Sequence, residues 1–195
     1  MHVNTHVAIG VLITTISTLI LPLTNLEFFV ALGGSFIQDF DILFSKYAPD
    51  ENHRLLFTHS IWLGVITILI GWYLSLYWVI IAGINSVCHV LIDSIDWGVA
   101  ILGEKTLYGP RILRRENNLT AKEIKARYPN YHCYFTIKWF CNRTMRVIEA
   151  SSIIGMVSCL LLLNDPFKIL VLIIYGFFAG FHYILLFKCI RQNPS

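Results

Sequence analysis

The chain has 195 residues, of which 56% are hydrophobic and only 14% are charged, and its mean hydropathy is +0.64. Soluble globular domains carry about 25% charged residues. This composition therefore excludes an ordinary soluble enzyme and indicates an integral membrane protein. The formal net charge of only +3 also argues against a nucleic-acid-binding protein.

Apolar segments separated by short polar breaks predict a bundle of transmembrane helices. They cover residues 7–23, 26–44, 61–92, 147–163 and 167–187. As a single helix, segment 61–92 would be about 48 Å long, which exceeds a hydrocarbon core of about 30 Å, so we expect it to fold back at Ser75. We predict one all-α domain over residues 1–195, a polytopic membrane helical bundle of about six helices in up-down order.

The basic residues predict the orientation of this bundle. Lys168 is the only one of the 15 Lys and Arg residues expected at the end opposite the two termini. By the positive-inside rule, both termini and the basic loop 103–146 lie in the cytoplasm of a multi-pass cell membrane protein. Within that loop, Thr120 and Glu123 have the spacing of a capping box, which predicts a short surface helix through Arg127.

The cysteines fit the same compartment. Their number, five, is odd, none forms a CxxC motif, and the cytoplasm is reducing, so we predict no structural disulfide. Two glycosylation sequons, at Asn118 and Asn142, would also lie in the cytoplasm, where we expect them to stay unmodified.

Ionisable side chains recur at the same predicted end of successive helices. Each such residue at membrane depth costs roughly 2.5 to 3.5 kcal/mol on insertion scales, which makes a group of them a functional-site hypothesis. Because neighbouring helices of an up-down bundle reverse direction, these helix ends meet at one level. We predict a metal site at the cytoplasmic end, with the ligands His6, Asp39, Asp41, His59, His89 and Asp93.

Spacing supports individual members of this set. His89 and Asp93 are four residues apart, which places both on one helical face about 6 Å apart, although a hydrogen-bonded packing pair explains the same spacing. Asp39 and Asp41 flank Phe40 and would diverge in a regular helix, but they can converge where the helix unwinds. We expect one of the two carboxylates to bind metal and the other to support it.

Other polar residues receive supporting roles. Thr58 can cap the helix that begins beside His59 and so hold the ligand in place. We place His53 beside the ligands rather than among them, and we expect His2, His132 and His182 to be structural. The supporting residues are Thr5, Thr58, Ser60, Asn85 and Asp96, the catalytic residues Asp93, Asp41 and His53, and the substrate-binding residues Arg54, Arg111, Arg114 and Arg115. Attraction to anionic lipids is the favoured explanation of the last three arginines.

The order of these motifs resembles a known family. It comprises Thr5-His6, the run Gly-Ser-Phe-Ile-Gln-Asp-Phe-Asp at 34–41, His53-Arg54, Thr58-His59-Ser60, and His89 with Asp93. This set is similar to the YdjM-like membrane-bound metal-dependent hydrolases over about residues 1–110, although Gln38 stands where the family usually has Pro. More remotely, it resembles the helical zinc phospholipase C and P1 nuclease group. That likeness implies phosphoester cleavage, with Asp93 bridging toward a second metal held partly by His6.

Together these observations predict a membrane-bound metal-dependent hydrolase of lipid metabolism. Imidazole and carboxylate ligands suit one or two divalent ions, with Zn foremost and Mn or Fe(II) as alternatives. Such an ion would activate a water molecule for hydrolysis. A site walled by apolar helices at the membrane surface favours a phosphoester of a phospholipid or lipid phosphate as substrate. The alternatives are a non-enzymatic metal-binding, haem-binding or transport protein, and a regulatory membrane scaffold whose basic loop binds a partner.

Overall fold

The chain is described here by a computed structural model, which covers residues 3–102, 107–113, 121–128, 130–162 and 167–192. These residues form α-helices and 3-10 helices, and an isolated bridge between Val99 and Tyr108 is their only β-type pairing. The all-α prediction is thereby confirmed. In chain order the helices are α1 (Val3–Thr18), α2 (Asn25–Gly33), η1 (Ile37–Tyr47), η2 (Pro49–Glu51), η3 (His53–Leu55), η4 (Phe57–His59), α3 (Ile61–Tyr73), α4 (Tyr77–Asp96), α5 (Ala121–Arg127), α6 (Tyr131–Cys141), α7 (Arg143–Leu162) and α8 (Phe167–Gln192).

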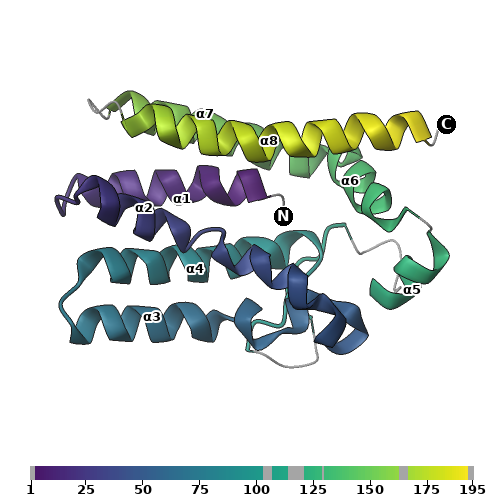
Figure 1. Ribbon diagram of the computed structural model, residues 1–195, viewed down its shortest axis with the longest axis horizontal. Helices are drawn as coiled ribbons and strands as arrows, with labels where there is room; N and C mark the ends of the chain where they lie inside the picture. Colours follow the sequence, from purple (N-terminus) through teal and green to yellow (C-terminus); the bar gives the residue numbers. More distant parts are fainter. Residues whose placement is uncertain (1–2, 103–106, 114–120, 129, 163–166, 193–195) are drawn as a thin grey trace.

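The long helices run along one common axis and successive ones reverse direction (Figure 1). The hairpin of α3 and α4 lies on one side, α7 and α8 lie on the other, and α1 and α2 lie between them. Helix α1 is the central element, because it packs against α2, α4, α7 and α8. Both described ends of the chain point toward the end of the bundle that carries the 3-10 helices, α5 and α6.

Four described segments are long and apolar enough to cross a membrane, namely Asn25–Tyr47, Tyr77–Asp96, Arg143–Leu162 and Lys168–Arg191. Helices α1 and α3 are also apolar but have only 16 and 13 residues. At 1.5 Å per residue they span about 24 and 20 Å, less than the roughly 30 Å of a hydrocarbon core. The structure therefore supports a membrane protein with four long crossing segments and two shorter apolar helices.

The predicted turn at Ser75 is present. Ser75 has φ of 56°, and the backbone N–H of Leu76 donates to the carbonyl of Gly71 at 2.8 Å, which closes the hairpin. Beyond the turn, α3 and α4 approach closely at Gly64 and Gly83. A Cβ on either glycine would come within 2.8 Å of the other's carbonyl oxygen, so this contact requires residues without side chains.

The second apolar segment departs from the prediction of one helix over residues 26–44. Helix α2 begins at a capping box of Thr24 and Glu27 and ends at Gly33, and the chain continues as the 3-10 helix η1. Adjacent glycines weaken an α-helix. In addition, a Cβ at Gly34 would overlap the carbonyl oxygen of Ala82, so α2 ends where its backbone lies against α4.

The loop 103–146 is more structured than predicted. Helix α5 occupies the expected position, although Thr120 of the predicted capping box lies outside the described residues. Helix α6 was not expected. It buries Trp139 against Leu113 and Met145, which form a second apolar cluster at the end of the bundle that carries the 3-10 helices.

The prediction of no disulfide is wrong. Cys133 of α6 is bonded to Cys189 near the end of α8, and both residues are buried. Counting cysteines could not reveal this bond, because the two residues are brought together only by the packing of α6 on α8. Cys88, Cys141 and Cys159 are free, as the prediction had them.

Replacing Gly34 by Ala should destabilise the protein, whereas the same change at Gly33 should not. A Cβ at Gly34 meets the backbone of Ala82, but a Cβ at Gly33 meets no other atom within 4 Å. Forced overpacking typically costs about 1 to 3 kcal/mol. Thermal unfolding in detergent should show a lower midpoint for Gly34→Ala and an equal or higher one for Gly33→Ala. Equal losses in both would show that α2 and α4 do not touch there.

Removing the disulfide should lower stability. It links residues 56 positions apart, and the chain-entropy model gives about 4 kcal/mol for a loop of that size. Cys133→Ser should therefore lower the thermal unfolding midpoint, and Cys141→Ser, which removes an exposed free thiol, should not. In protein alkylated inside intact cells, non-reducing peptide mapping should recover Cys133 joined to Cys189. Recovery of both as alkylated thiols would contradict the bond.

Candidate metal centre

The predicted ligands converge from separate elements. His6 comes from the first turn of α1, and His89 and Asp93 come from α4. The 3-10 helices supply the others: Asp39 and Asp41 lie on η1, and His59 ends η4. All these elements meet at one end of the bundle (Figure 1), so the prediction of a shared level is correct for the placement of these residues.

Asp93 is the centre of the cluster. Its Oδ1 lies 2.9 Å from Nε2 of His6, and its Oδ2 lies 3.0 Å from Nε2 of His59. Nε2 of His89 is 3.8 Å from the same Oδ2. Asp93 is fully buried, so one carboxylate joins three histidines from three elements of the fold.

The imidazole rings gather around this carboxylate. The rings of His6 and His89 stack with their centroids 3.9 Å apart, and His59 lies edge-on to His89 at 5.0 Å. The Nε2 atoms of His59 and His89 are only 3.3 Å apart. His53 extends the group, because its ring lies edge-on to His59 at 5.2 Å. Such converging nitrogen atoms are the arrangement that a bound cation requires.

The structure separates the roles of the two η1 carboxylates. Asp41 Oδ2 accepts hydrogen bonds from Nδ1 of His59 at 3.1 Å and from the hydroxyl of Thr58 at 3.0 Å. Asp39 instead places Oδ1 3.7 Å from Nε2 of His89, and its buried Oδ2 has no hydrogen-bond partner. Asp39 is thus the candidate ligand and Asp41 the support.

The 3-10 backbone explains why both carboxylates face inward. Residues two apart are about 160° apart around an α-helix but only about 120° apart around a 3-10 helix. Both Asp39 and Asp41 can therefore reach the cluster while Phe40, which lies between them, is 53% exposed.

Hydrogen bonds orient the histidine rings. The Nδ1–H of His59 donates to Asp41, and the Nδ1–H of His89 donates to the carbonyl of Ser35 at 2.8 Å. Each bond leaves Nε2 turned toward Asp93. Supporting bonds of this kind fix the tautomer and the direction of metal-ligating histidines. Ser35 was not predicted, and a backbone acceptor has no signal in the sequence.

Arg54, predicted to bind substrate, is buried inside the cluster. Its guanidinium makes two bonds to Asp96, at 2.5 and 3.2 Å, and its Nη2 lies 3.2 Å from Oδ2 of Asp93. Asp96 was expected to support the ligands, and it does so by binding Arg54, a partner that the sequence did not indicate. Burial opposes charging, but Asp93 and Asp96 hold the pKa of Arg54 above its ordinary value, so the guanidinium stays charged.

The other predicted residues are distributed around this centre. The prediction that Thr58 caps α3 is wrong, because the N-cap residue is Ser60 and the Thr58 hydroxyl donates to Asp41 instead. Thr5 and Ser60 are buried and adjoin the ligands His6 and His59 in the sequence. Asn85 donates to Thr14 and to the carbonyl of Ala31, which joins α4 to α1 and α2. Arg111 is exposed, while Arg114 and Arg115 lie outside the described residues.

The charges of the cluster favour a cation. Within the described residues, four carboxylates surround a single guanidinium, that of Arg54. The surroundings shift the pKa values of His59 and His53 in opposite directions. Burial lowers the pKa of His59, but its bonds to Asp41 and Asp93 outweigh burial and raise the pKa to about 9. Burial, with the nearby charges of His59 and Arg54, holds the pKa of His53 well below its ordinary value, so this ring is neutral.

Two overlapping donor groups could each hold a cation. The first is His6, Asp39, His89 and Asp93, and the second is Asp39, His53 and His59, with the donor atoms of each group within 4.8 Å of one another. Asp39 belongs to both groups. Sequence analysis placed His53 beside the ligands, but the structure places it among the candidates, because the 3-10 turns fold His53 back toward His59.

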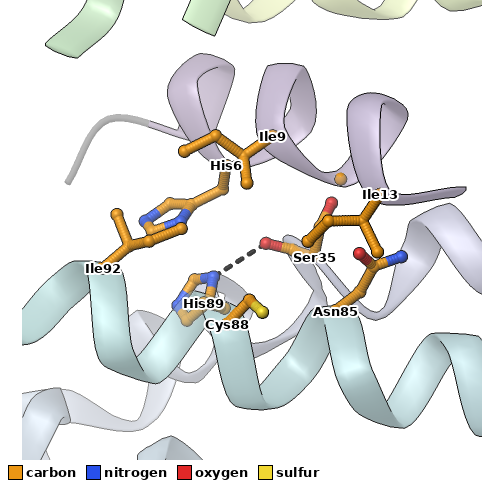
Figure 2. Close-up of a pocket in the computed structure, with 9 residues that line it drawn as sticks. His6, Ile9, Ile13, Ser35, Asn85, Cys88, His89 and Ile92 are labelled. Atoms are coloured by element: carbon orange, nitrogen blue, oxygen red, sulfur yellow. Dashed lines mark hydrogen bonds between the residues drawn. The ribbon is translucent and has the colours of Figure 1, made fainter. Parts of the chain in front are cut away.

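A narrow pocket lies behind the histidines, between α1 and α4 (Figure 2). It is too narrow to admit a water molecule, and its lining is His6, Ile9, Gly10, Ile13, Ser35, Asn85, Cys88, His89 and Ile92. Figure 2 shows His6 and His89 at one end and Asn85 at the other.

No protein-family model, curated protein or solved structure matches the chain. The resemblance to the YdjM-like hydrolases therefore remains a prediction that rests on the motifs quoted above.

Replacing Arg54 by Met should strongly destabilise the protein. The change leaves Asp93 and Asp96 without their guanidinium partner, and breaking a buried ion pair costs about 3 to 5 kcal/mol. Arg54→Lys keeps the charge and should lose less. Arg143→Met, at an exposed position, is the matched control. Thermal unfolding of the four proteins in detergent tests this order, and an unfolding midpoint of Arg54→Met equal to that of the control would contradict it.

Proposed function

We propose that this protein is a membrane-bound metal-dependent hydrolase that cleaves a phosphoester of a phospholipid or lipid phosphate. The observation that carries the proposal is the position of Asp93. Its two oxygen atoms face His6 on one side and His59 on the other, at 2.9 and 3.0 Å. The remote resemblance to the zinc phospholipase C group implies that Asp93 would bridge toward a second metal, whereas the carboxylate common to both donor groups is that of Asp39.

The residues of the cluster fit such a centre. The buried Oδ2 of Asp39 and the buried Nδ1 of His6 have no hydrogen-bond partner, and burial without a partner is costly for polar atoms. A cation held by the first donor group would satisfy Asp39, and the second group would share the same carboxylate. Mixed nitrogen and oxygen donors suit Zn best among the expected ions, with Mn or Fe(II) as alternatives.

When bound, a divalent cation lowers the pKa of a coordinated water and stabilises negative charge on a phosphoryl oxygen. The residues of the chain prepare that chemistry. Asp41 and Ser35 hold His59 and His89 in place, and the guanidinium of Arg54 pairs with Asp93 and Asp96 inside an apolar bundle. We assign the catalytic roles to Asp93, as the central ligand, and to His53, and a positioning role to Asp41, which accepts a hydrogen bond from His59.

The outer face of η1 supports a lipid as the substrate. While Asp39 and Asp41 point inward, the opposite face of the same 3-10 helix exposes Phe40 and Leu43. This helix belongs to a segment apolar enough to cross a membrane. A single 3-10 helix thus separates the cluster from the surrounding apolar phase. The headgroup of a lipid could reach the cluster while its acyl chains stay in the bilayer. A large soluble polymer has no such apolar part, so it fits this setting less well.

We place the centre and both termini on the cytoplasmic side, because the basic residues of the sequence are expected at this end of the bundle. The disulfide between Cys133 and Cys189 lies at the same end, where cytoplasmic thiols would reduce an accessible bond. Both cysteines are buried, and burial shields the sulfur atoms from an attacking thiol. The basic residues therefore decide the proposed orientation.

The geometry disfavours haem, the alternative that uses the same histidines. Haem needs two axial ligands that face each other across its ring. The rings of His6 and His89 instead stack directly, with 3.9 Å between their centroids. A metal transporter without hydrolytic activity would keep the centre, so measurements of binding and of turnover are both required.

Detergent-purified protein should contain one or two divalent ions per chain by mass spectrometry. Asp93→Asn and His59→Ala should both lose them, because each removes a donor atom of the cluster. The matched controls Asp50→Asn, at an exposed carboxylate, and His182→Ala, on α8, should keep the wild-type content. Wild-type protein that binds no metal after addition of Zn or Mn would contradict the proposed metal-dependent hydrolase.

Turnover separates an enzyme from a binding protein. Wild-type protein loaded with Zn should release phosphate or a phosphorylated headgroup from mixed phospholipid micelles. Asp93→Asn should abolish this release while remaining folded by circular dichroism. Metal binding without release from any lipid phosphoester, together with metal flux in vesicles, would favour the transport alternative.

A further inference from the structure

A second buried polar cluster lies apart from the metal centre, where α1 meets α7. Glu149 of α7 is only 5% exposed, although it belongs to a segment apolar enough to cross a membrane. Its Oε1 accepts a hydrogen bond from Nδ2 of Asn4 at 2.7 Å, and its Oε2 accepts one from Nε1 of Trp139 at 3.4 Å. An acidic residue at this depth is costly, so it is a functional-site hypothesis.

The position of Asn4 connects this cluster to the metal centre. Asn4 precedes His6 by two residues on α1, so their side chains point about 200° apart around the helix. One side chain therefore contacts α7 and the other contacts α4: Asn4 binds Glu149, and His6 binds Asp93. The first turn of α1 is held between two polar contacts on opposite sides.

Apolar side chains also join α1 to α7. Val7, Val11, Met156 and Leu160 belong to one apolar cluster, and Leu12 lies against Gly155. Apolar surfaces of this kind are non-directional and specify the axial position of a helix weakly, whereas one buried polar pair specifies it strongly. A shift of α1 by one helical turn would move His6 by about 5.4 Å, which exceeds its distance from Asp93.

We propose that Glu149 is a positioning residue for His6. By holding Asn4, it fixes the axial register of α1 against α7 and so sets the distance from Nε2 of His6 to Asp93. Thr14 also contacts α4, through Asn85, but it lies more than two turns further along α1. The role at the metal centre rests on the proposed function, whereas the register of α1 does not.

Cysteine cross-linking measures the register without any metal. In a chain with Cys88, Cys141 and Cys159 changed to Ser, Leu12→Cys and Gly155→Cys place two thiols at a point of contact. Copper-phenanthroline should cross-link them efficiently. Glu149→Leu should reduce the cross-link yield at least several-fold. Glu149→Gln, which retains an acceptor for Asn4, should keep it, as should the control Ser152→Ala, whose hydroxyl bonds only within α7.

Zinc affinity, measured by competition with a chelator, tests the effect on His6. Loss of a group that supports a metal ligand typically lowers affinity 10- to 100-fold. We expect a loss of that size for Glu149→Leu and none for Glu149→Gln. His6→Ala should weaken binding by itself, and Glu149→Leu should then cause no further loss, because both changes act through the same ligand.

The outcomes separate the two proposals. A wild type that binds no zinc would overturn the proposed function, and the cross-link yields would still decide the register. Zinc binding with an unchanged cross-link yield in Glu149→Leu would overturn the positioning role. So would an equal loss of affinity for Glu149→Leu in the wild-type and His6→Ala backgrounds, because the effect would then not pass through His6.

Discussion

The burial of the Asp93 carboxylate is the constraint on which the rest of the structure depends. Asp93 is fully buried near the end of an apolar helix, where a charge without partners is not tolerated. The fold supplies partners from three other elements: His6 from α1, Arg54 from η3 and His59 from η4. The irregular segment between α2 and α3 brings two of these partners, Arg54 and His59, inward. Regular α-helix in its place would turn the same side chains away from α4.

Arg54 balances only part of the negative charge, and this imbalance links structure to function. Its guanidinium is shared between Asp93 and Asp96, so Asp39 and Asp41 depend on the histidines. Histidines can offset the charge only by holding protons, as the raised pKa of His59 shows. A divalent cation would offset it while leaving the imidazoles neutral. This shortage of positive charge would favour the binding of a divalent cation.

Much of this arrangement follows from the sequence, because the apolar segments and their polar breaks depend on local patterns. Hydropathy located the hairpin at Ser75, and alternating helix direction brought His6, His59 and His89 to one end. The unexpected features depend on tertiary contacts instead. Gly34 ends α2 because it touches Ala82, and Arg54 turns inward because Asp96 is there. Neither Cys133 with Cys189 nor Asn4 with Glu149 has a signal in the sequence, because each pair spans elements distant along the chain.

The short helices explain why the centre lies at one end of the bundle rather than in its middle. Helices α1 and α3, with 16 and 13 residues, fall short of a hydrocarbon core of about 30 Å. Their shared end with η3 and η4 is where backbone groups must find partners other than α-helical ones. There Ile61 donates to the carbonyl of Ile101, and Ala100 donates to that of Arg54. Non-helical backbone is tolerated at membrane depth only where protein surrounds it. The turns that satisfy this requirement also carry His53 and His59, so the backbone that ends the helices early also brings these histidines into the cluster.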